Sequence, residues 1–194
     1  MTDLKNDIES IIYYDDFPNT FGVDNIEFAA GKGCFGKIEF PTCFLTDISH
    51  YEVSHYTLLD TVEIGACHFL DGLADYYNYD FKGRKFKKLI FCNPFGFGLH
   101  QKFEGIRFIQ RAGELLEDVG EIFLLGQMAN PFVKKKNVEK RIGEYNKEND
   151  EDKWIIEREL DSSELEEINS KHTFYTSTGI TIKPNIGYII KRCS

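Results

Sequence analysis

The most informative stretch of the sequence is a short apolar segment that leads into closely spaced glycines. Residues 25–29 have the pattern of a strand, Gly31-Lys32-Gly33 follows, and a second strand-like segment ends at Asp47, fourteen residues past Gly33. Glycines let the backbone pass close to a ligand, and an acid at the end of the next strand accepts hydrogen bonds from ribose hydroxyls. The order of these features predicts a nucleotide-type site. The alternative for Asp47 is an N-cap of the following helix.

A second candidate site follows the apolar run at residues 86–92, where the chain continues as Asn93-Pro94-Phe95-Gly96-Phe97-Gly98. A carboxamide oxygen can accept a hydrogen bond from a nucleophilic amine, and the next backbone carbonyl can accept another, which together would orient a nitrogen lone pair. Phe95 or Phe97 could stack on a planar substrate. The alternative is that this segment is only a turn, because Asn-Pro and Phe-Gly pairs are common in turns.

No other group of side chains has the spacing of a reactive site. The five cysteines have neither the spacing of a disulfide framework nor that of a zinc ribbon, and the five histidines show no metal-ligand spacing, so no metal site is expected. The basic run at residues 134–136, with Lys140 and Arg141, is interpreted as a solvated face, although it could contact a phosphate.

The elements that must position these residues alternate between short apolar runs and amphipathic stretches. Strands are expected at 25–29, 42–46, 61–64, 86–92, 121–125, 154–160, 174–178 and 187–191, and helices at 4–14, 51–59, 103–116 and from 162, with Ser162 or Ser163 as the N-cap. Gly120 should end the helix that precedes residue 121, and 134–153 should be a solvated helix and loop. This pattern predicts an α/β fold: a three-layer sandwich with a seven-stranded, mostly parallel sheet and an antiparallel C-terminal strand. We expect one domain over 1–194, with an N-terminal helix and lead-in at 1–20 and the core at 21–194.

Several of these segments together resemble class I S-adenosylmethionine-dependent methyltransferases. Residues 27–33 (EFAAGKG) look like the first motif of that family, 46–49 (TDIS) like the second, and 93–96 (NPFG) like the motif of amino-group methyltransferases. Residues 115–125 are similar to the entry to the fifth strand and the strand itself. The late strands, with Thr178-Gly179 and Pro184 between them, fit the reversed hairpin that closes this fold.

The resemblance implies a Rossmann-like fold and a role for each matching residue. Residues implied to bind the cofactor S-adenosylmethionine are Glu27, Ala29, Gly31, Gly33, Asp47, Ile48 and Ala66; those implied to act at the methyl acceptor are Asn93, Pro94 and Phe95. Glu27 would lie near the methionine part, Asp47 at the ribose and Ile48 on the adenine. Ala29 replaces the first glycine of the motif, which is tolerable if its φ is negative. Gly65-Ala66 replaces an acid that meets the adenine amino group.

Composition limits the partners of such a protein. The 194 residues carry 23 Lys and Arg against 32 Asp and Glu, a formal net charge of −9. This charge repels phosphate backbones and disfavours binding of duplex nucleic acid. No apolar run approaches the roughly 20 residues of a membrane span, and the polar N-terminus does not resemble a signal peptide, so a cytoplasmic protein without a membrane partner is expected.

Two functions therefore remain open from the sequence. The first is a methyltransferase that acts on a nitrogen or other small nucleophile, in a small molecule, a single-stranded nucleic acid or a protein. The second is a methyltransferase-like binding protein without catalysis, such as an immunity protein or an inactive regulatory subunit. Its carboxylates, such as those at 150–152 or 164–167, would face a basic protein partner.

Overall fold

The computed structural model describes residues 23–30, 35–47, 72–94, 99–175 and 180–193. The strands in these ranges are β1 (Asn25–Phe28), β2 (Cys43–Asp47), β3 (Gly72–Leu73), β4 (Phe86–Cys92), β5 (Leu116–Gly126), β6 (Trp154–Glu159), β7 (Phe174–Tyr175), β8 (Thr181–Ile182) and β9 (Ile186–Arg192). The helices are α2 (Phe35–Glu39), α3 (Lys102–Leu115), α4 (Lys135–Glu148) and α5 (Ser162–Lys171). The helices expected at 4–14 and 51–59 and the strand expected at 61–64 lie outside the described residues.

The central sheet has the order β3-β2-β1-β4-β5-β9-β6 within the described part of the chain. From β3 to β5 all neighbouring strands are parallel, and β9 is antiparallel to both β5 and β6. The predicted α/β class, with a mostly parallel sheet and an antiparallel C-terminal strand, is therefore confirmed.

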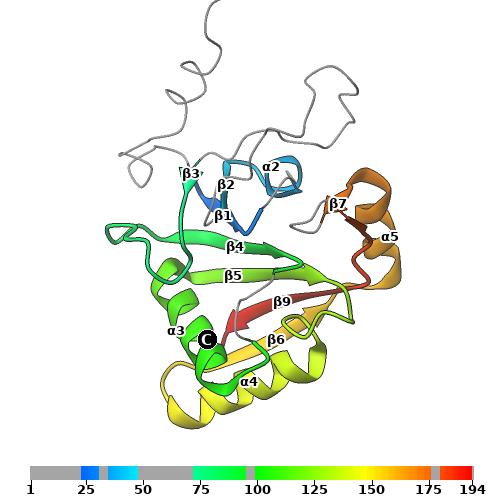
Figure 1. Ribbon diagram of the computed structural model, residues 1–194. Coiled ribbons are helices and arrows are strands. Elements are labelled where there is room, and N and C mark those ends of the chain that lie inside the picture. Colours follow the sequence, from blue (N-terminus) through cyan, green and yellow to red (C-terminus); the bar gives the residue numbers. More distant parts are fainter. Residues whose placement is uncertain (1–22, 31–34, 48–71, 95–98, 176–179, 194) are drawn as a thin grey trace, which may run out of the picture.

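The central strands are apolar on both faces because helices cover both sides of the sheet. Along β4, Leu89 and Phe91 face one core cluster, and Ile90 between them faces the other. The first cluster contains apolar residues of α3 and α4, and the second contains Phe35 of α2 and packs against α5. Figure 1 shows α3 and α4 together on one side of the sheet and α5 on the other. Burial on both faces explains why these strands read as unbroken apolar runs.

The boundary between α3 and β5 differs from the prediction. The helix ends at Leu115 and the strand starts at Leu116, so Gly120 lies inside β5 and does not end the helix. Phe86 pairs with Leu116, but Lys88 already pairs with Glu121. The extra residues of β5 form a bulge, which is why Val119 is 88% exposed.

Helix α4 is not the solvated helix that its charge suggested. It buries Val138, Ile142 and Tyr145 against the sheet, and Arg141 is only 6% exposed. The Arg141 guanidinium donates to the carbonyl oxygens of Leu99 and His100, at 3.4 and 2.9 Å, and pairs with Glu144. Arg141 therefore fixes the chain between β4 and α3. None of the described helices is long and apolar enough to cross a membrane.

The late strands pair differently from the expected hairpin. Residues 174–175 pair with β8 in a separate two-stranded sheet, whereas β9 pairs with β5 and β6. The expectation that 174–178 and 187–191 form the closing pair is wrong. The segment between β6 and β9 instead forms α5 and the β7–β8 ribbon, which Figure 1 shows beside α2.

Helix α5 begins with a capping box in which Asp161, not Ser162 or Ser163, is the N-cap. Asp161 Oδ1 accepts from the backbone N–H of Glu164, and Glu164 Oε2 accepts from the N–H of Asp161, each at 2.9 Å. We predict that Asp161→Ala lowers the free energy of unfolding by about 1 kcal/mol. Ser162→Ala and Ser163→Ala should change it by less than half that amount. Urea unfolding of the three variants compares these values, and equal losses would contradict the assignment.

Candidate functional site

The carboxyl ends of β2, β1 and β4 form the candidate site because the connections of the chain diverge there. From β1 the chain proceeds to β2 and β3 on one side, and β4 lies on the other side of β1. In open parallel sheets ligands bind outside the carboxyl ends of the strands at such a switch point.

Five of the expected site residues lie at these strand ends: Glu27, Ala29, Asp47, Asn93 and Pro94. The sheet therefore brings together residues that are up to 67 positions apart, from Glu27 to Pro94. The expected site residues Gly31, Gly33, Ile48, Ala66 and Phe95 lie outside the described residues, and their roles stay predictions.

Hydrogen bonds join the end of β1 to the end of β2. The Ala30 N–H donates to the Thr46 carbonyl at 3.0 Å, and the Thr46 hydroxyl donates to the Glu27 carbonyl at 2.9 Å. The Asp47 carbonyl accepts from the Ala74 N–H at 3.0 Å, just beyond β3. Asp47 itself is only 3% exposed. The acid expected at a ribose is thus held rigidly at the predicted edge of the sheet.

Glu27 is a buried carboxyl at the end of β1. Its Oε2 accepts from the Gly36 N–H of α2 at 2.6 Å, and its side chain also bonds to the Cys92 thiol. Desolvation raises the pKa of Glu27 from 4.5 to about 7, although these two hydrogen bonds partly oppose the shift. Burial raises the pKa of the Cys92 thiol well above its usual value, so this thiol is a hydrogen-bond donor and not a thiolate.

Gly36 is required by the close approach of α2 to β1, a constraint that the sequence analysis missed. A Cβ at this position would lie 2.7 Å from both Glu27 Oε2 and Cys43 Sγ. Gly31 and Gly33, the glycines expected to approach a ligand, precede this helix in the sequence, whereas the contact needs a glycine inside its first turn.

Ala29 does not meet the condition under which it could replace glycine without strain. Its φ is +54°, in the left-handed region, where an L-residue other than Gly, Asn or Asp carries a steric cost of roughly 1 kcal/mol. The replacement of glycine by Ala29 is therefore strained. The turn has the backbone conformation that glycine would favour, and it carries alanine.

Asn93 also has a left-handed backbone, with φ of +50°, but asparagine adopts this region readily. Its N–H donates to the Leu125 carbonyl at 2.6 Å, which ties the end of β4 to β5. Its side-chain oxygen accepts from the Gln127 N–H at 3.3 Å and from Asn130 Nδ2 at 3.0 Å. The oxygen expected to align an amine is thus engaged by two donors of the chain.

Two asparagines that the sequence analysis did not place in the site lie beside it: Asn130 in the loop after β5, and Asn185 directly before β9. Asn130 Nδ2 donates to the Pro94 carbonyl at 3.0 Å as well as to Asn93. Asn185 Oδ1 accepts from the Met128 N–H at 2.7 Å, and the Asn185 N–H donates to Gly126 at 2.9 Å. A signal for Asn130 exists, because residues 130–132 repeat the Asn-Pro-Phe of 93–95.

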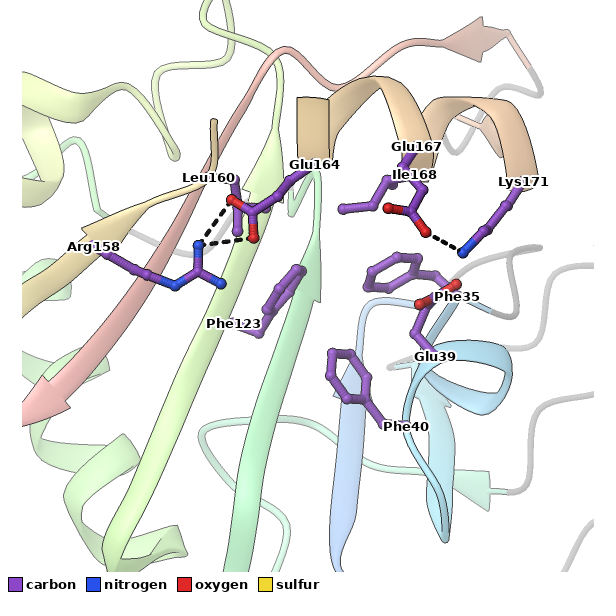
Figure 2. Close-up of a pocket in the computed structure, with 10 residues that line it drawn as sticks. All are labelled: Phe35, Glu39, Phe40, Phe123, Arg158, Leu160, Glu164, Glu167, Ile168 and Lys171. Atoms are coloured by element: carbon purple, nitrogen blue, oxygen red, sulfur yellow. Dashed lines mark hydrogen bonds and ion pairs between the residues drawn. The ribbon is translucent and has the colours of Figure 1, made fainter. Parts of the chain in front are cut away.

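A cavity of about 220 Å³ lies between α2 and α5, on the face of the sheet that these helices cover. Figure 2 shows Phe35, Phe40 and Phe123 on one side of it, with ring centroids between 5.4 and 5.9 Å apart. The charged residues of its rim pair with one another: Glu164 with Arg158, and Glu167 with Lys171. Glu39 bonds to the buried His172 at 2.6 Å. This cavity offers an aromatic surface with a largely neutralised rim.

No group of three or more His, Cys, Asp or Glu side chains within the described ranges is placed to hold a metal ion. The chemistry that the described residues offer is hydrogen bonding at the strand ends, from two buried acids and from a carboxamide turn.

The buried Glu27 predicts a pH dependence of stability. Since its pKa is higher in the folded protein than its ordinary value, its contribution favours folding below pH 4.5 and is lost as pH rises toward about 7. Between pH 5.5 and 8.5 this loss amounts to about 2 kcal/mol. In Glu27→Gln, which keeps an acceptor for the Gly36 N–H, that part of the dependence should vanish. Urea unfolding of both proteins at these two pH values measures it; parallel pH profiles would refute a raised pKa.

Comparisons with known proteins give only distant likenesses. No protein-family model and no curated protein sequence matches this chain. Among solved structures, an antibiotic-related methyltransferase aligns with a TM-score of 0.45 and 13% sequence identity. The alignment covers 100% of this chain and 96% of the methyltransferase chain. A SAM-dependent methyltransferase from Methanosarcina mazei aligns with a TM-score of 0.37 and 15% identity, covering 93% and 97%. At TM-scores below 0.5 neither likeness carries an argument about the function of this chain.

Proposed function

We propose that this protein binds S-adenosylmethionine at the carboxyl ends of β1 and β2 and transfers its methyl group to a small-molecule or protein substrate. The observation that supports this function is the convergence of Glu27, Asp47 and Asn93-Pro94 on three adjacent parallel strands at the switch point. These are the residues on which the resemblance to class I methyltransferases depends.

The donor set at this edge fits such a cofactor. Asp47 would accept from the ribose hydroxyls, since its backbone is fixed at the end of β2 and its carboxyl is a strong acceptor. Glu27 holds the first turn of α2 in place through its hydrogen bond with the Gly36 N–H. Gly31, Gly33, Ile48 and Ala66 complete the proposed cofactor site.

The bound sulfonium supplies an already activated methyl group, so the protein needs mainly to exclude water and to align the acceptor atom. Asn93, Pro94 and Phe95 are the residues proposed to act at that acceptor. If the acceptor is a nitrogen, the Pro94 carbonyl is the better candidate to align it. Its oxygen receives one hydrogen bond, from Asn130, whereas the Asn93 oxygen receives two.

Calorimetry with S-adenosylmethionine and S-adenosylhomocysteine tests the proposal. We expect micromolar binding to the wild-type protein and a loss of affinity of about ten- to a hundredfold in Asp47→Ala, as expected for removal of a charged acceptor. Asp24→Ala is the matched control, because Asp24 lies just before β1, at the opposite end of the strand, and pairs with Lys87 at the surface. A folded wild-type protein that binds neither compound at millimolar concentration would exclude this function.

A second candidate function, a binding module for a basic protein, is supported by a groove at the opposite edge of the sheet. The groove, of about 840 Å³, is lined by the β5 bulge, the start of β6 and the end of β9. Val119 and Ile155 are 88% and 46% exposed there. Asp118 and Glu151 are exposed carboxylates with no ion pair to another described residue. Apolar side chains beside free carboxylates suit a partner segment that carries both apolar and basic side chains.

Of the carboxylates at 164–167, which were expected to face such a partner, Glu164 and Glu167 are paired within the chain. Glu164 belongs to the capping box and pairs with Arg158, and Glu167 pairs with Lys171. The proposed docking surface therefore moves to the groove that contains Asp118 and Glu151.

Charge reversal tests this second function. We expect a lysine-rich peptide to bind the wild-type protein at low salt, and Asp118→Lys with Glu151→Lys to reduce the affinity about tenfold or more. The control Glu104→Lys with Glu166→Lys makes the same change of net charge at exposed positions on α3 and α5. Fluorescence anisotropy of the labelled peptide measures both. An equal loss in both double variants would indicate only a response to net charge and would contradict a docking groove.

A further inference from the structure

A chain of hydrogen bonds joins the turn after β4 to the loop after β5, and every link in it is a carboxamide or a backbone group. The Phe132 N–H donates to Asn130 Oδ1 at 2.9 Å. Asn130 Nδ2 then donates to Asn93 Oδ1 and to the Pro94 carbonyl, both at 3.0 Å. The Gln127 N–H donates to the same Asn93 oxygen at 3.3 Å.

These bonds fix which way each carboxamide points. A backbone N–H can only donate, so Phe132 selects the oxygen of Asn130 and leaves its amide nitrogen facing Asn93 and Pro94. The Gln127 N–H independently selects the oxygen of Asn93. Oxygen and nitrogen of an asparagine are otherwise assigned only from their surroundings, and here two backbone donors give the same answer.

The consequence is a hydrogen-bond donor at the end of β4 that no described residue uses. Asn93 is only partly buried, and its oxygen already accepts two hydrogen bonds, which is its full capacity. Its amide nitrogen has two N–H groups and no hydrogen bond to any of the described residues. The side chain is thus held so that it presents donors, which is the reverse of the acceptor role expected from the sequence.

We propose that Asn93 is a hydrogen-bond donor that recognises an acceptor oxygen, a carboxylate or carbonyl, on the molecule bound at the switch point, and that Asn130 is the residue that positions it. This inference rests on the proposed methyltransferase function and narrows its substrate class. The oxygen belongs either to the carboxylate of the cofactor or to the methyl-accepting substrate.

The chemistry favours a carboxylate. A hydrogen bond to a charged acceptor is about twice as strong as one between neutral groups. Glu27 lies at the end of β1, next to β4, and Asp47 lies one strand further, at the end of β2, so an anion bound at this edge needs donors to offset their charge. The Asn93 amide is such a donor.

Asn93→Asp is the decisive variant because it exchanges only the donor. Aspartate keeps an acceptor for the Gln127 N–H and for Asn130 Nδ2, and it tolerates the left-handed φ of 50°. It replaces the NH2 group with a second acceptor. Asn93→Ala is less informative, since alanine would add strain in this backbone and would remove the acceptor of the Gln127 N–H and one acceptor of Asn130 Nδ2.

Asn185→Asp is the matched control. Asn185 is exposed, belongs to the same cluster of loops, and likewise uses its oxygen to accept a backbone N–H, that of Met128. Its substitution by aspartate adds the same charge and keeps that bond. Asn185 makes no hydrogen bond to Asn93 or Asn130. A loss of affinity in Asn93→Asp but not in Asn185→Asp therefore indicates a specific role of Asn93 and not an effect of the added charge.

The test is titration of ¹⁵N-labelled protein with sodium acetate, methylammonium chloride and S-adenosylhomocysteine, observed through amide resonances. Acetate should shift the Asn93 side-chain NH2 signal, which is identified by its absence in Asn93→Asp. Acetate affinity, read from the Gln127 and Phe132 amides, should fall at least tenfold in Asn93→Asp and stay within twofold in Asn185→Asp. Unchanged acetate binding in Asn93→Asp, or methylammonium that shifts the wild-type Asn93 signal in place of acetate, would overturn the proposal.

The third ligand distinguishes the source of the oxygen. A tenfold loss of S-adenosylhomocysteine affinity in Asn93→Asp alone assigns the oxygen to the cofactor carboxylate, and unchanged affinity assigns it to the substrate. If the wild-type protein binds acetate at Asn93 but not S-adenosylhomocysteine, the methyltransferase function fails while the donor role stands. Asn93→Gly, which removes the donor and adopts a positive φ without strain, replaces the aspartate variant if that does not fold.

Discussion

The parallel pairing of β1 with both β2 and β4 is the constraint on which the candidate site depends. Glu27 pairs with Leu45 on one side and with Ile90 on the other. Because these strands run in the same direction, their carboxyl ends meet at one edge, and the residues just beyond them become neighbours. A slip of one residue in either pairing would turn Glu27 toward the face covered by α3 and α4. The register thus determines both the fold and the chemistry of this edge.

Glu27 shows how this edge combines stability with a polar group. Burying a carboxyl disfavours its charged form, and the raised pKa expresses that cost. The Gly36 N–H and the Cys92 thiol reduce the cost by donating to it, and α2 can approach only because Gly36 has no side chain. The acid therefore fixes the helix that follows the glycine turn, whether or not it also meets a cofactor. A structural and a functional role for Glu27 are compatible.

The sequence correctly predicted elements whose pattern is local. Its predictions were wrong where contacts between residues distant in the sequence determine the structure. β4 was predicted at its observed bounds because a strand buried on both faces is a continuous apolar run. The end of α3 was misplaced because the bulge of β5 is set by pairing with β4, not by Gly120. Arg141 was assigned to a solvated face, yet it is buried and donates hydrogen bonds to backbone carbonyls about forty residues earlier in the sequence. The strand ends could be predicted. The loop after β5 that completes the edge could not, since the repeated Asn-Pro-Phe at 130–132 marks Asn130 but not its hydrogen-bond partners.

Asn93 illustrates why residue type alone does not determine the role of a carboxamide. The sequence supplies a side chain that can accept or donate with equal ease, and the choice between them belongs to the loop after β5. Two backbone N–H groups of that loop, those of Gln127 and Phe132, leave only one orientation in which every inner group is paired. Asn93 has a left-handed backbone, and its side-chain oxygen lies against β5 at Gly126, where a Cβ would be only 3.1 Å from it. The donor character of this edge is therefore a property of tertiary structure, built from residues that are individually ordinary turn formers.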